Sequence, residues 1–415
     1  MYIKRKLEGK ILKYLNSPEI IAVVGPRQCG KTTMLKKIFD SLDHAVFLSF
    51  DDRAALNMFN RDIDDFAEVY VKNKKYLFID EFQYAKNGGK KLKYLFDAHK
   101  IKIFISGSSA IDLTVNALKY LVGRIFVFNL FPLDFEEFLS YKNKNYLSSL
   151  ALANKHFKSL ASDKAGEELQ SALMKYYEEY AIYGGYPRVV LAGDDAEKQE
   201  VLKNIFNTYF LREVRDILGL IEDYKLEKLI SGLALQIGNL IEYNELAKLS
   251  EFTYPTLKKY SNFLEKTFIC ARVKPYFNNK RTEIVKNPKI FFYDSGLRNI
   301  IINDFRKLDR RPDAGALLEN AVFCQLTKGG YEFNYWRDKK KHEVDFVLKL
   351  ADRELLAVEI KSRSKTNNSA SIVSFNKIHP EAKIILVYAN VEKNNKTESL
   401  PKDSLIQGAY LIYAI

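Results

Sequence analysis

Phosphate chemistry is indicated by eight residues near the start of the chain, Gly25-Pro26-Arg27-Gln28-Cys29-Gly30-Lys31-Thr32. They follow the P-loop pattern G-x-x-x-x-G-K-T. Glycines at both ends of this loop let the backbone approach phosphate oxygens closely. The ammonium of Lys31 can then lie between the β- and γ-phosphates of a nucleotide, and the hydroxyl of Thr32 can coordinate Mg²⁺.

The residues on either side predict the elements that must position this loop. Ile20–Val24 is an apolar, β-branched run, which is typical of a buried parallel strand. Thr33–Phe39 carries apolar residues at helical spacing. A loop that opens into a helix N-terminus aims backbone N–H groups and the positive end of the helix dipole at an anion. The alternative, a chance glycine turn before a core helix, does not explain why both elements are present.

A second apolar run ends in two carboxylates. Tyr76-Leu77-Phe78-Ile79 precedes Asp80 and Glu81, which is the Walker B pattern. Asp80 at the strand end can hold the Mg²⁺ shell, and Glu81 can polarise the attacking water. Because the carboxyl ends of parallel strands meet at one edge of a sheet, both side chains are expected beside the P-loop. ATP and Mg²⁺ are the expected ligands, and ATP hydrolysis is the expected reaction.

Two further residues could complete this site, and each has a structural alternative. The strand-like Ile101–Ile105 is followed by four residues in which Ser108 is the best candidate to hydrogen-bond a γ-phosphate or water. These serines could equally cap the next helix. Arg124 precedes another strand-like run and could stabilise transition-state charge, in its own subunit or in a neighbouring one. A structural salt bridge is an equal alternative for Arg124.

Several short stretches occur in an order that resembles one family. They are Gly25–Thr33, Phe78–Gln83, Ser106–Ser109, Gly123-Arg124 and Phe131–Leu139. This order resembles the prokaryotic AAA-type ATPases that carry the C-terminal DUF4143 region, which has a restriction-endonuclease-like core. The resemblance implies a P-loop ATPase with its Walker A motif at Gly25–Thr32 and its Walker B motif at Asp80-Glu81. Thr33 is predicted as a further nucleotide-binding residue. AAA-type relatives often form rings, so it also leaves a homo-oligomer open.

Composition narrows the class of protein. The chain has 415 residues, is 47% hydrophobic and has a formal net charge of +13. It has no apolar run near the ~20 residues of a membrane span, so a cytoplasmic protein without a membrane partner is expected. Three widely separated cysteines indicate neither a disulfide framework nor a zinc site. The positive charge favours a polyanion such as DNA, although a lysine-rich solvated surface is the alternative.

The middle of the chain is expected to be helical over 141–225 and to form a winged helix-turn-helix over 226–305. Two helix patterns, Tyr243–Ser250 and Tyr254–Lys266, flank a three-residue turn and precede two strand-like runs. The second helix and the wing carry cations that could contact DNA phosphates, namely Lys258, Lys259, Lys280 and Arg281. Winged helices also dock proteins, so a protein partner remains an alternative.

Residues 313–415 show the element order of a restriction-endonuclease-like fold: helix, three strands, helix, strand. Glu359 and Lys361 are two apart on one predicted strand, so both project from the same face. Asp345 lies on the adjacent strand, and Glu319 could join from the preceding helix. Asp345 and Glu359 could bind Mg²⁺ while Lys361 stabilises phosphorane charge. The alternative is a solvated strand face with alternating charges.

Taken together, the sequence predicts an α/β protein with an AAA-type P-loop NTPase domain at 1–140, a helical and winged-helix middle, and a C-terminal α/β restriction-endonuclease-like domain. The predicted function is an ATPase coupled to a DNA-binding, nuclease-like domain, with nuclease activity left open. The alternative is a non-cleaving regulatory ATPase that docks a protein partner.

Overall fold

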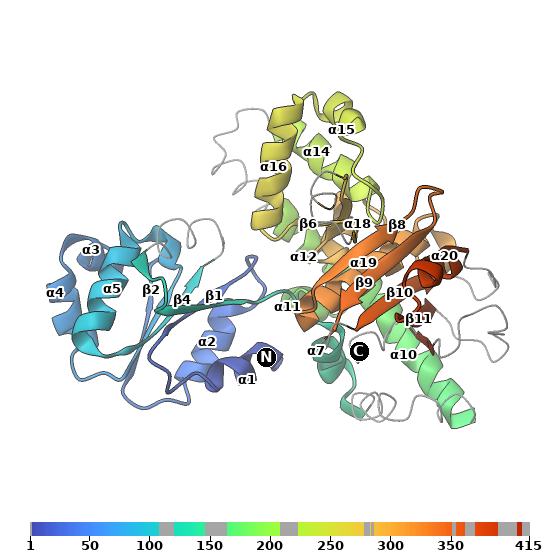
Figure 1. The fold of residues 1–415 in the computed structure, drawn as a ribbon. Coiled ribbons are helices and arrows are strands. Elements are labelled where there is room, and N and C mark those ends of the chain that lie inside the picture. The colour runs from blue at the N-terminus through green and yellow to red at the C-terminus, as the bar shows by residue number, and fades with distance from the viewer. Residues whose placement is uncertain are drawn as a thin grey trace. The chain divides into compact units, whose positions relative to one another are not determined.

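The computed structural model describes residues 2–107, 120–145, 164–207, 223–277, 283, 286–350, 354–361, 370–388 and 405–408. The chain forms two compact units, which are described separately (Figure 1). The first comprises Met1–Leu133 with Asn262–Ile269, and the second comprises Asp134–Ser261 with Cys270–Ile415.

A five-stranded parallel sheet forms the centre of the first unit, as the sequence predicts. The strand order is β2-β3-β4-β1-β5, so β4 lies between the strand before the P-loop and the Walker B strand. Every neighbouring pair is parallel. The strands are β1 Ile20–Val24, β2 Ala45–Ser49, β3 Tyr76–Asp80, β4 Lys102–Gly107 and β5 Ile125–Asn129.

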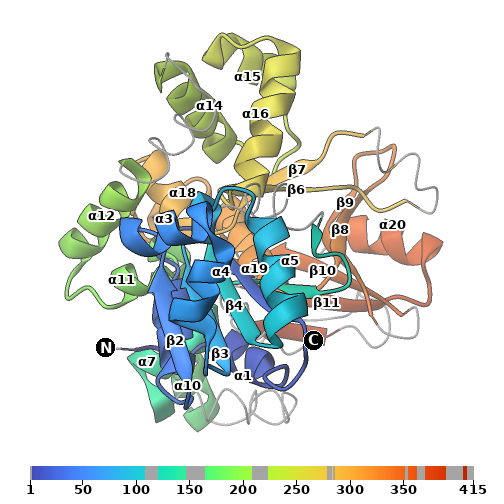
Figure 2. The ribbon, with the colours of Figure 1, turned by 90° about the vertical axis from the view of Figure 1, so that its left-hand side faces the viewer.

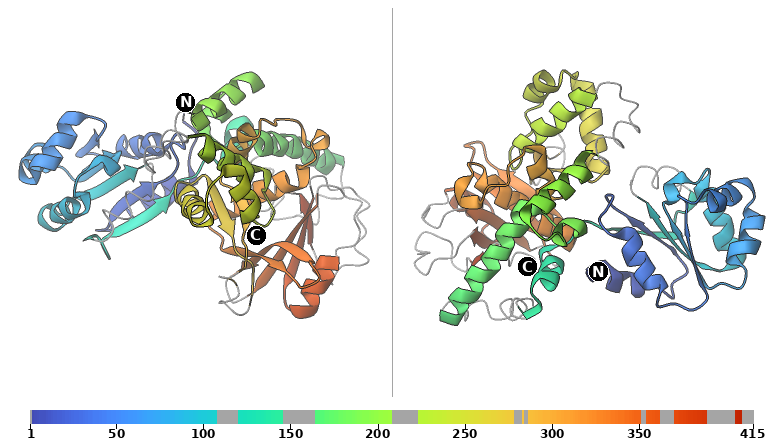
Figure 3. Two further views of the ribbon diagram at one scale, coloured as in Figure 1. Left: turned by 90° about the horizontal axis from the view of Figure 1, so that it is seen from above. Right: turned by 180° about the vertical axis from the view of Figure 1, so that it is seen from behind.

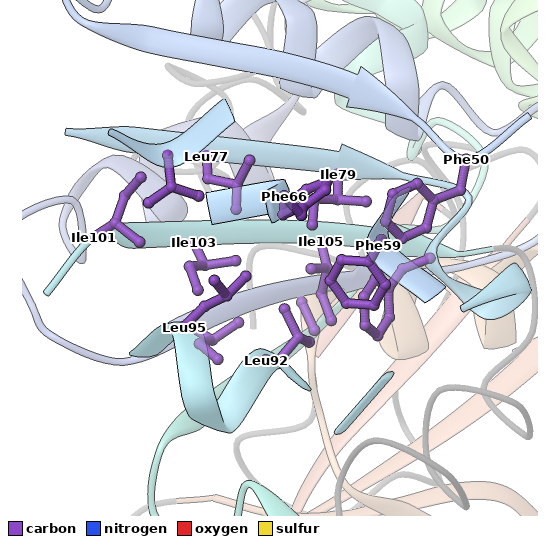
Figure 4. Close-up of a cluster of buried hydrophobic side chains, with 14 of the residues drawn as sticks. Phe50, Phe59, Phe66, Leu77, Ile79, Leu92, Leu95, Ile101, Ile103 and Ile105 are labelled. Carbon is purple, nitrogen blue, oxygen red and sulfur yellow. The ribbon is translucent and has the colours of Figure 1, made fainter. Parts of the chain in front are cut away.

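Helices cover both faces of this sheet, which explains the continuous apolar runs of its strands. Alternate residues of β1 belong to different cores: Ala22 packs in one cluster and Val23 in the other. One cluster includes side chains of α1 (Lys6–Leu12) and α2 (Lys31–Phe39). The other takes Phe59, Phe66, Leu92 and Leu95 from α3 (Arg53–Arg61), α4 (Ile63–Phe66) and α5 (Gly88–His99) (Figure 4). Figure 2 shows α4 and α5 in front of the strands.

The second unit begins with the predicted helical region. Its helices are α7 Phe135–Lys142, α10 Lys164–Tyr183, α11 Pro187–Val190, α12 Asp195–Asn204, α14 Asp223–Leu235 and α18 Ser295–Ile301. α18 packs against α10, α12 and α14, so it joins the helical region from later in the chain. In the part of the chain that the structure describes, no helix combines the length and apolar character that crossing a membrane requires.

The helix pair and strand pair of the middle region lie where the sequence places them. α15 spans Tyr243–Ser250 and α16 spans Tyr254–Lys266, with Glu251 in the left-handed region between them. β6 (Cys270–Val273) and β7 (Lys289–Phe292) pair in antiparallel fashion. The winged-helix interpretation of these elements stays a prediction.

The C-terminal region contains a mixed five-stranded sheet in the order β12-β11-β10-β9-β8. β8–β9 and β9–β10 are antiparallel, whereas β10–β11 and β11–β12 are parallel. Figure 3 shows these strands in orange and red, with α20 beside them. The elements are α19 Ala314–Gly329, β8 Phe333–Arg337, β9 Glu343–Lys349, β10 Leu355–Lys361, α20 Ala370–Ile378, β11 Lys383–Tyr388 and β12 Leu405–Gly408. The element order matches the prediction, and β12 is an addition to it.

Strand β7 packs into the core of the C-terminal region, although the sequence analysis assigns it to the preceding domain. The side chain of Asn320 in α19 accepts a hydrogen bond from Phe292 N–H at 2.7 Å and donates one to the Phe292 carbonyl oxygen at 3.2 Å. The ring of Phe291 stacks on Phe323 of α19, with 5.0 Å between centroids. The predicted regions 226–305 and 313–415 therefore share a core.

Candidate functional site

The P-loop lies between β1 and α2, and its two glycines have separate structural reasons. Gly30 has φ 98° and caps the N-terminus of α2, a conformation that favours glycine. Gly25 has no room for a side chain, because a Cβ there would lie 2.0 Å from the Leu130 carbonyl oxygen. Pro26 follows Gly25, and Arg27 and Gln28 form the turn before Cys29. The loop therefore presents its backbone at the carboxyl edge of the sheet.

The ammonium of Lys31 is held by the loop itself. Its Nζ donates to the carbonyl oxygens of Gly25 and Pro26, each at 2.9 Å. The side chain is buried, and both partners are neutral. An incoming phosphate oxygen carries negative charge and forms a stronger, charge-assisted hydrogen bond than a neutral carbonyl does. Lys31 is thus kept in place by partners that an anion can replace.

Thr32 and Asp80 meet at this edge, as the sequence predicts. Thr32 Oγ1 donates to Asp80 Oδ2 at 2.6 Å. The other carboxylate oxygen, Oδ1, accepts from the hydroxyl of Ser106, a buried residue near the end of β4. A hydroxyl and a carboxylate at one point form the oxygen donor set that Mg²⁺ prefers, so the residues present fit this ion.

Glu81 follows Asp80 directly but has a different backbone conformation. Its φ is 53°, in the left-handed region, and it begins the short 3₁₀ helix Phe82–Tyr84. The carboxylate accepts a hydrogen bond from the side-chain amide of Gln83. Because the backbone turns at Glu81, the side chains of Glu81 and Asp80 point in different directions. The hydrogen bond from Gln83 orients the Glu81 carboxylate.

Arg5 supports the loop from outside the motif, a role that the sequence does not predict. Its Nη1 donates to the Cys29 carbonyl oxygen at 2.7 Å, and its Nη2 to the Phe131 carbonyl oxygen at 2.6 Å. Cys29 is buried, and its thiol donates to the Leu130 carbonyl oxygen at 3.2 Å. An arginine in a basic N-terminal stretch has no spacing relationship to the motif, so no sequence pattern points to this role.

The other two predicted residues of the ATP site differ in outcome. Ser108 lies outside the described residues, and Ser106 is the serine that contacts Asp80. Arg124 comes directly before β5, at the amino edge of the parallel sheet and therefore opposite the P-loop. It forms an exposed ion pair with Asp97 at 3.3 Å. This position favours the structural alternative over a role in its own subunit, and a role across a subunit boundary stays a prediction.

The predicted residues of the C-terminal site do come together. Asp345 Oδ2 accepts a hydrogen bond from Ile360 N–H at 2.8 Å, which places it next to Glu359 and Lys361 on the neighbouring strand. Lys361 Nζ lies 2.6 Å from Glu359 Oε1. Asp345 and Glu359 are buried. This burial excludes the alternative of a solvated strand face for these two carboxylates.

A lysine that the sequence analysis did not select lies in this cluster. Lys289, the first residue of β7, is 1% exposed. Its Nζ lies 2.6 Å from Glu343 Oε1, 3.5 Å from Glu319 Oε2 and 3.7 Å from Asp345 Oδ1. A single lysine before an apolar run is typical of the solvated start of a strand. The place of Lys289 in the acidic cluster therefore becomes visible only in the fold.

Burial and mutual repulsion shift the titration of these groups. Burial, and then the neighbouring Asp345 carboxylate, raise the pKa of Glu319 to about 8. The same two causes raise the pKa of Glu359 to about 8. Burial alone would lower the pKa of Lys289, but the charges of Glu319, Asp345 and Glu343 outweigh it and raise that pKa above its ordinary value.

Within the described ranges, no group of three or more Asp, Glu, His or Cys side chains is spaced to hold a metal ion.

The predicted DNA-contacting residues are only partly described. Lys258 and Lys259 are exposed on α16, and the Lys258 ammonium lies 4.6 Å from the centroid of the Tyr254 ring. Lys280 and Arg281 lie outside the described residues.

Comparison with known proteins divides the chain into three matched regions. Residues 17–139 match the family described as AAA domain. Residues 174–311 and 314–403 match two domains of unknown function, DUF8612 and DUF4143 respectively. The first unit has the AAA-type P-loop ATPase fold. The match over 314–403 agrees with the family resemblance of the sequence. The winged-helix and nuclease-like interpretations stay predictions.

Relatives and solved structures extend over much of the chain. An uncharacterized protein of Haemophilus influenzae is 26% identical over 98% of this chain and 96% of its own length. An uncharacterized protein of Methanocaldococcus jannaschii is 28% identical over 92% of this chain and 82% of its own. A Walker-type ATPase of Pyrococcus abyssi is 16% identical, with a TM-score of 0.45 over 72% of this chain and 96% of that one. The structural likeness is too distant to support a conclusion.

Proposed function

We propose that the AAA-type domain binds and hydrolyses ATP, and that this cycle controls the C-terminal region. The observation that carries the proposal is the meeting of Thr32, Asp80 and Ser106 beside a P-loop whose Lys31 donates to two neutral carbonyl groups. These groups come from β3, β4 and the first turn of α2, so three segments that meet at one edge of the sheet form the site.

Each residue has a task that its position allows. Backbone N–H groups at the start of α2 bind phosphate oxygens, and Lys31 exchanges its carbonyl partners for the β- and γ-phosphates. Thr32 and Asp80 would hold Mg²⁺, which supplies charge neutralisation at the phosphates when it is bound. Glu81 accepts a hydrogen bond from the attacking water and polarises it, while Gln83 keeps the carboxylate in place.

For the C-terminal region, the first candidate output is metal-dependent cleavage of DNA. The net charge of +13 and the exposed Lys258 and Lys259 support contact with a polyanion. Asp345, Glu359 and Lys361 lie together as such a site would require. This candidate needs Asp345 and Glu359 to be available to Mg²⁺.

The second candidate is a regulatory ATPase that docks a protein partner without cleaving DNA. One observation favours it: the buried Lys289 ammonium lies among the carboxylates of Glu319, Glu343 and Asp345. The cluster then has a cation of its own, which lies near one oxygen of each of these three carboxylates.

ATP hydrolysis by the purified protein tests the first part of the proposal. Lys31→Ala should lower turnover by about 10²–10³. Lys37→Ala, which changes an exposed lysine on the same helix, should retain it. Equal turnover by Lys31→Ala and the wild type would refute the assigned site.

DNA binding and cleavage, followed in the same reactions, separate the two outputs. Cleavage that requires Mg²⁺ and is abolished in Asp345→Asn would establish the nuclease. Binding without cleavage should weaken as salt rises, and a Lys258→Ala/Lys259→Ala variant should reduce the salt slope by about one for each phosphate that it no longer neutralises. Hydrolysis that is indifferent to DNA, with no binding at low salt, would favour the protein-docking switch.

A further inference from the structure

We propose that Lys289 is the resident cation of the C-terminal acidic cluster, and that it locks β7 to the C-terminal sheet and keeps divalent metal ions out. The proposal concerns the second unit alone, so it stands whether or not the P-loop hydrolyses ATP. It differs from the sequence-based expectation, in which Asp345 and Glu359 hold Mg²⁺.

The first argument is the position of the ammonium group. Lys289 Nζ lies within 3.7 Å of carboxylate oxygens from Glu319, Glu343 and Asp345, which belong to α19 and β9. Its side chain is 2% exposed, so it cannot turn to solvent without moving β7. A divalent cation on these oxygens would stand next to a buried positive charge, where repulsion is screened much less than in water.

The second argument is that two further carboxylate oxygens in the cluster are engaged, whereas Glu359 Oε2 is buried without a hydrogen-bond partner among the described residues. Asp345 Oδ2 accepts from Ile360 N–H at 2.8 Å, and Glu359 Oε1 lies 2.6 Å from Lys361 Nζ. Magnesium demands near-ideal octahedral geometry with oxygen ligands. An ion shared by Asp345 and Glu359 would therefore compete with a backbone hydrogen bond and with two lysines. In this arrangement the residues do not fit a resident metal ion.

The third argument is that Lys289 lies in a strand that the C-terminal region already holds. The backbone of Phe292 is paired with the Asn320 side chain, and Phe291 stacks on Phe323. After β6, the chain also pairs with β8: Tyr276 N–H donates to the Tyr335 carbonyl oxygen, and Tyr335 N–H donates to the Lys274 carbonyl oxygen. These contacts fix β7 in register, so they place Lys289 in the acidic cluster.

The test compares two methionine substitutions of buried lysines in nucleotide-free protein. Lys289→Met keeps the length of the side chain and removes its charge. Lys198→Met is the matched control, because Lys198 is also mostly buried and lies 2.9 Å from both Glu179 and Asp195 in the same unit. Both are made in an Asp80→Asn background, so that Thr32 and Asp80 do not contribute a metal site. Mn²⁺ binding is measured by electron paramagnetic resonance, and unfolding temperature is measured with and without Mn²⁺ or Mg²⁺.

We expect one Mn²⁺ per chain to bind Lys289→Met, at least about tenfold more tightly than the parent, because the removed charge lies about 4 Å from the site. Addition of Asp345→Asn should remove this gain, and Mn²⁺ should raise the unfolding temperature of Lys289→Met but not of Lys198→Met. A parent protein that binds one Mn²⁺, and loses it in Asp345→Asn, would overturn the proposal. So would a folded Lys289→Met that binds no more Mn²⁺ than the parent.

If Lys289→Met does not fold, Mn²⁺ binding by the parent protein still tests the proposal. In that event Lys289→Met/Glu319→Gln removes one carboxylate along with the lysine and leaves Glu343, Asp345 and Glu359 for a cation. Stoichiometric Mn²⁺ binding by this double variant, absent from the parent, supports the lock, and its failure to bind Mn²⁺ when folded contradicts it.

Discussion

Two buried lysines, Lys31 in the P-loop and Lys289 in the C-terminal acidic cluster, are held in opposite ways. Lys31 donates to two neutral carbonyl oxygens of its own loop. Lys289 lies among three carboxylates from elements far along the chain. The first keeps its full charge available to an anion, whereas the charge of the second is already compensated within the protein.

The difference shows that the charge of its partners decides whether a buried lysine can bind a ligand or stabilises the fold. A neutral carbonyl is a weaker partner than a phosphate oxygen, so Lys31 gains by exchanging it for a ligand. A buried lysine with charged partners gains nothing comparable from a further ligand, and loss of one partner leaves a charge unpaired in a poorly solvated place. Lys31 is therefore suited to binding an anion, whereas Lys289 is suited to holding elements of the fold together.

The largest expected effect tests the structural half of this comparison. Lys289→Met should lower the free energy of unfolding by about 3–5 kcal/mol, because it leaves buried carboxylates without their cation. ATP turnover per folded molecule should not change. Urea denaturation combined with a turnover assay measures both, and a loss of stability no larger than about 1 kcal/mol, the typical effect of a point mutation, would contradict the lock.

For Lys31→Met we expect the reverse: a large loss of turnover and a smaller loss of stability. The rate of hydrolysis should fall by about 10²–10³, the usual effect of removing one donor that stabilises transition-state charge. Stability should change by no more than about 1.5–3 kcal/mol, the range for hydrogen bonds to a charged group. Steady-state kinetics and denaturation check these values, and a variant that unfolds while keeping its turnover would break the comparison.

A pH series sharpens the description of the acidic cluster. The pKa of Glu319 rises from 4.5 to about 8 in the folded protein, so the folded state binds more protons than the unfolded state between these values. Its contribution to stability is complete below pH 4.5 and is lost as pH rises through about 8. Glu319→Gln should weaken this decline, which thermal unfolding at several pH values would measure. An identical decline in the variant and the wild type would contradict the assignment.

The smallest effect is expected at Arg124. Its ion pair with Asp97 is exposed, at 37% and 46% of the two side chains, so Arg124→Ala should change stability by about 0–1 kcal/mol. Turnover at low protein concentration should be unaffected, because Arg124 lies at the opposite edge of the sheet from the P-loop. A loss of turnover that appears only as protein concentration rises would instead indicate a role across a subunit boundary.

Local patterns predict the geometry around the P-loop well because its key groups are close in sequence. A strand, a glycine loop and a helix are adjacent in sequence, and Lys31 bonds carbonyl groups only five and six residues away. Asp80 is predictable because parallel strands carry their carboxyl ends to one edge. The exceptions are Arg5 and Ser106, whose roles depend on packing rather than on spacing.

The C-terminal site is predicted less completely, because its charges meet through long-range packing. Alternation along one strand places Glu359 beside Lys361, and the element order places Asp345 nearby. Neither pattern reveals that the pKa of Glu359 is raised by burial, or that Lys289 compensates these carboxylates. Both the burial of Glu359 and the position of Lys289 depend on which elements cover the sheet.

The sequence by itself determined the P-loop pattern and, apart from β12, the order of helices and strands along the chain in the two α/β regions, since these follow from periodicity and adjacent residues. Only the tertiary structure decided that Arg124 lies away from the P-loop and that Lys289 lies beside Asp345, a predicted metal ligand, and beside Glu319 and Glu343. The physical reason is that sequence spacing fixes the direction of a side chain within its own strand or helix. The charges that it meets are fixed by elements that arrive from elsewhere in the chain.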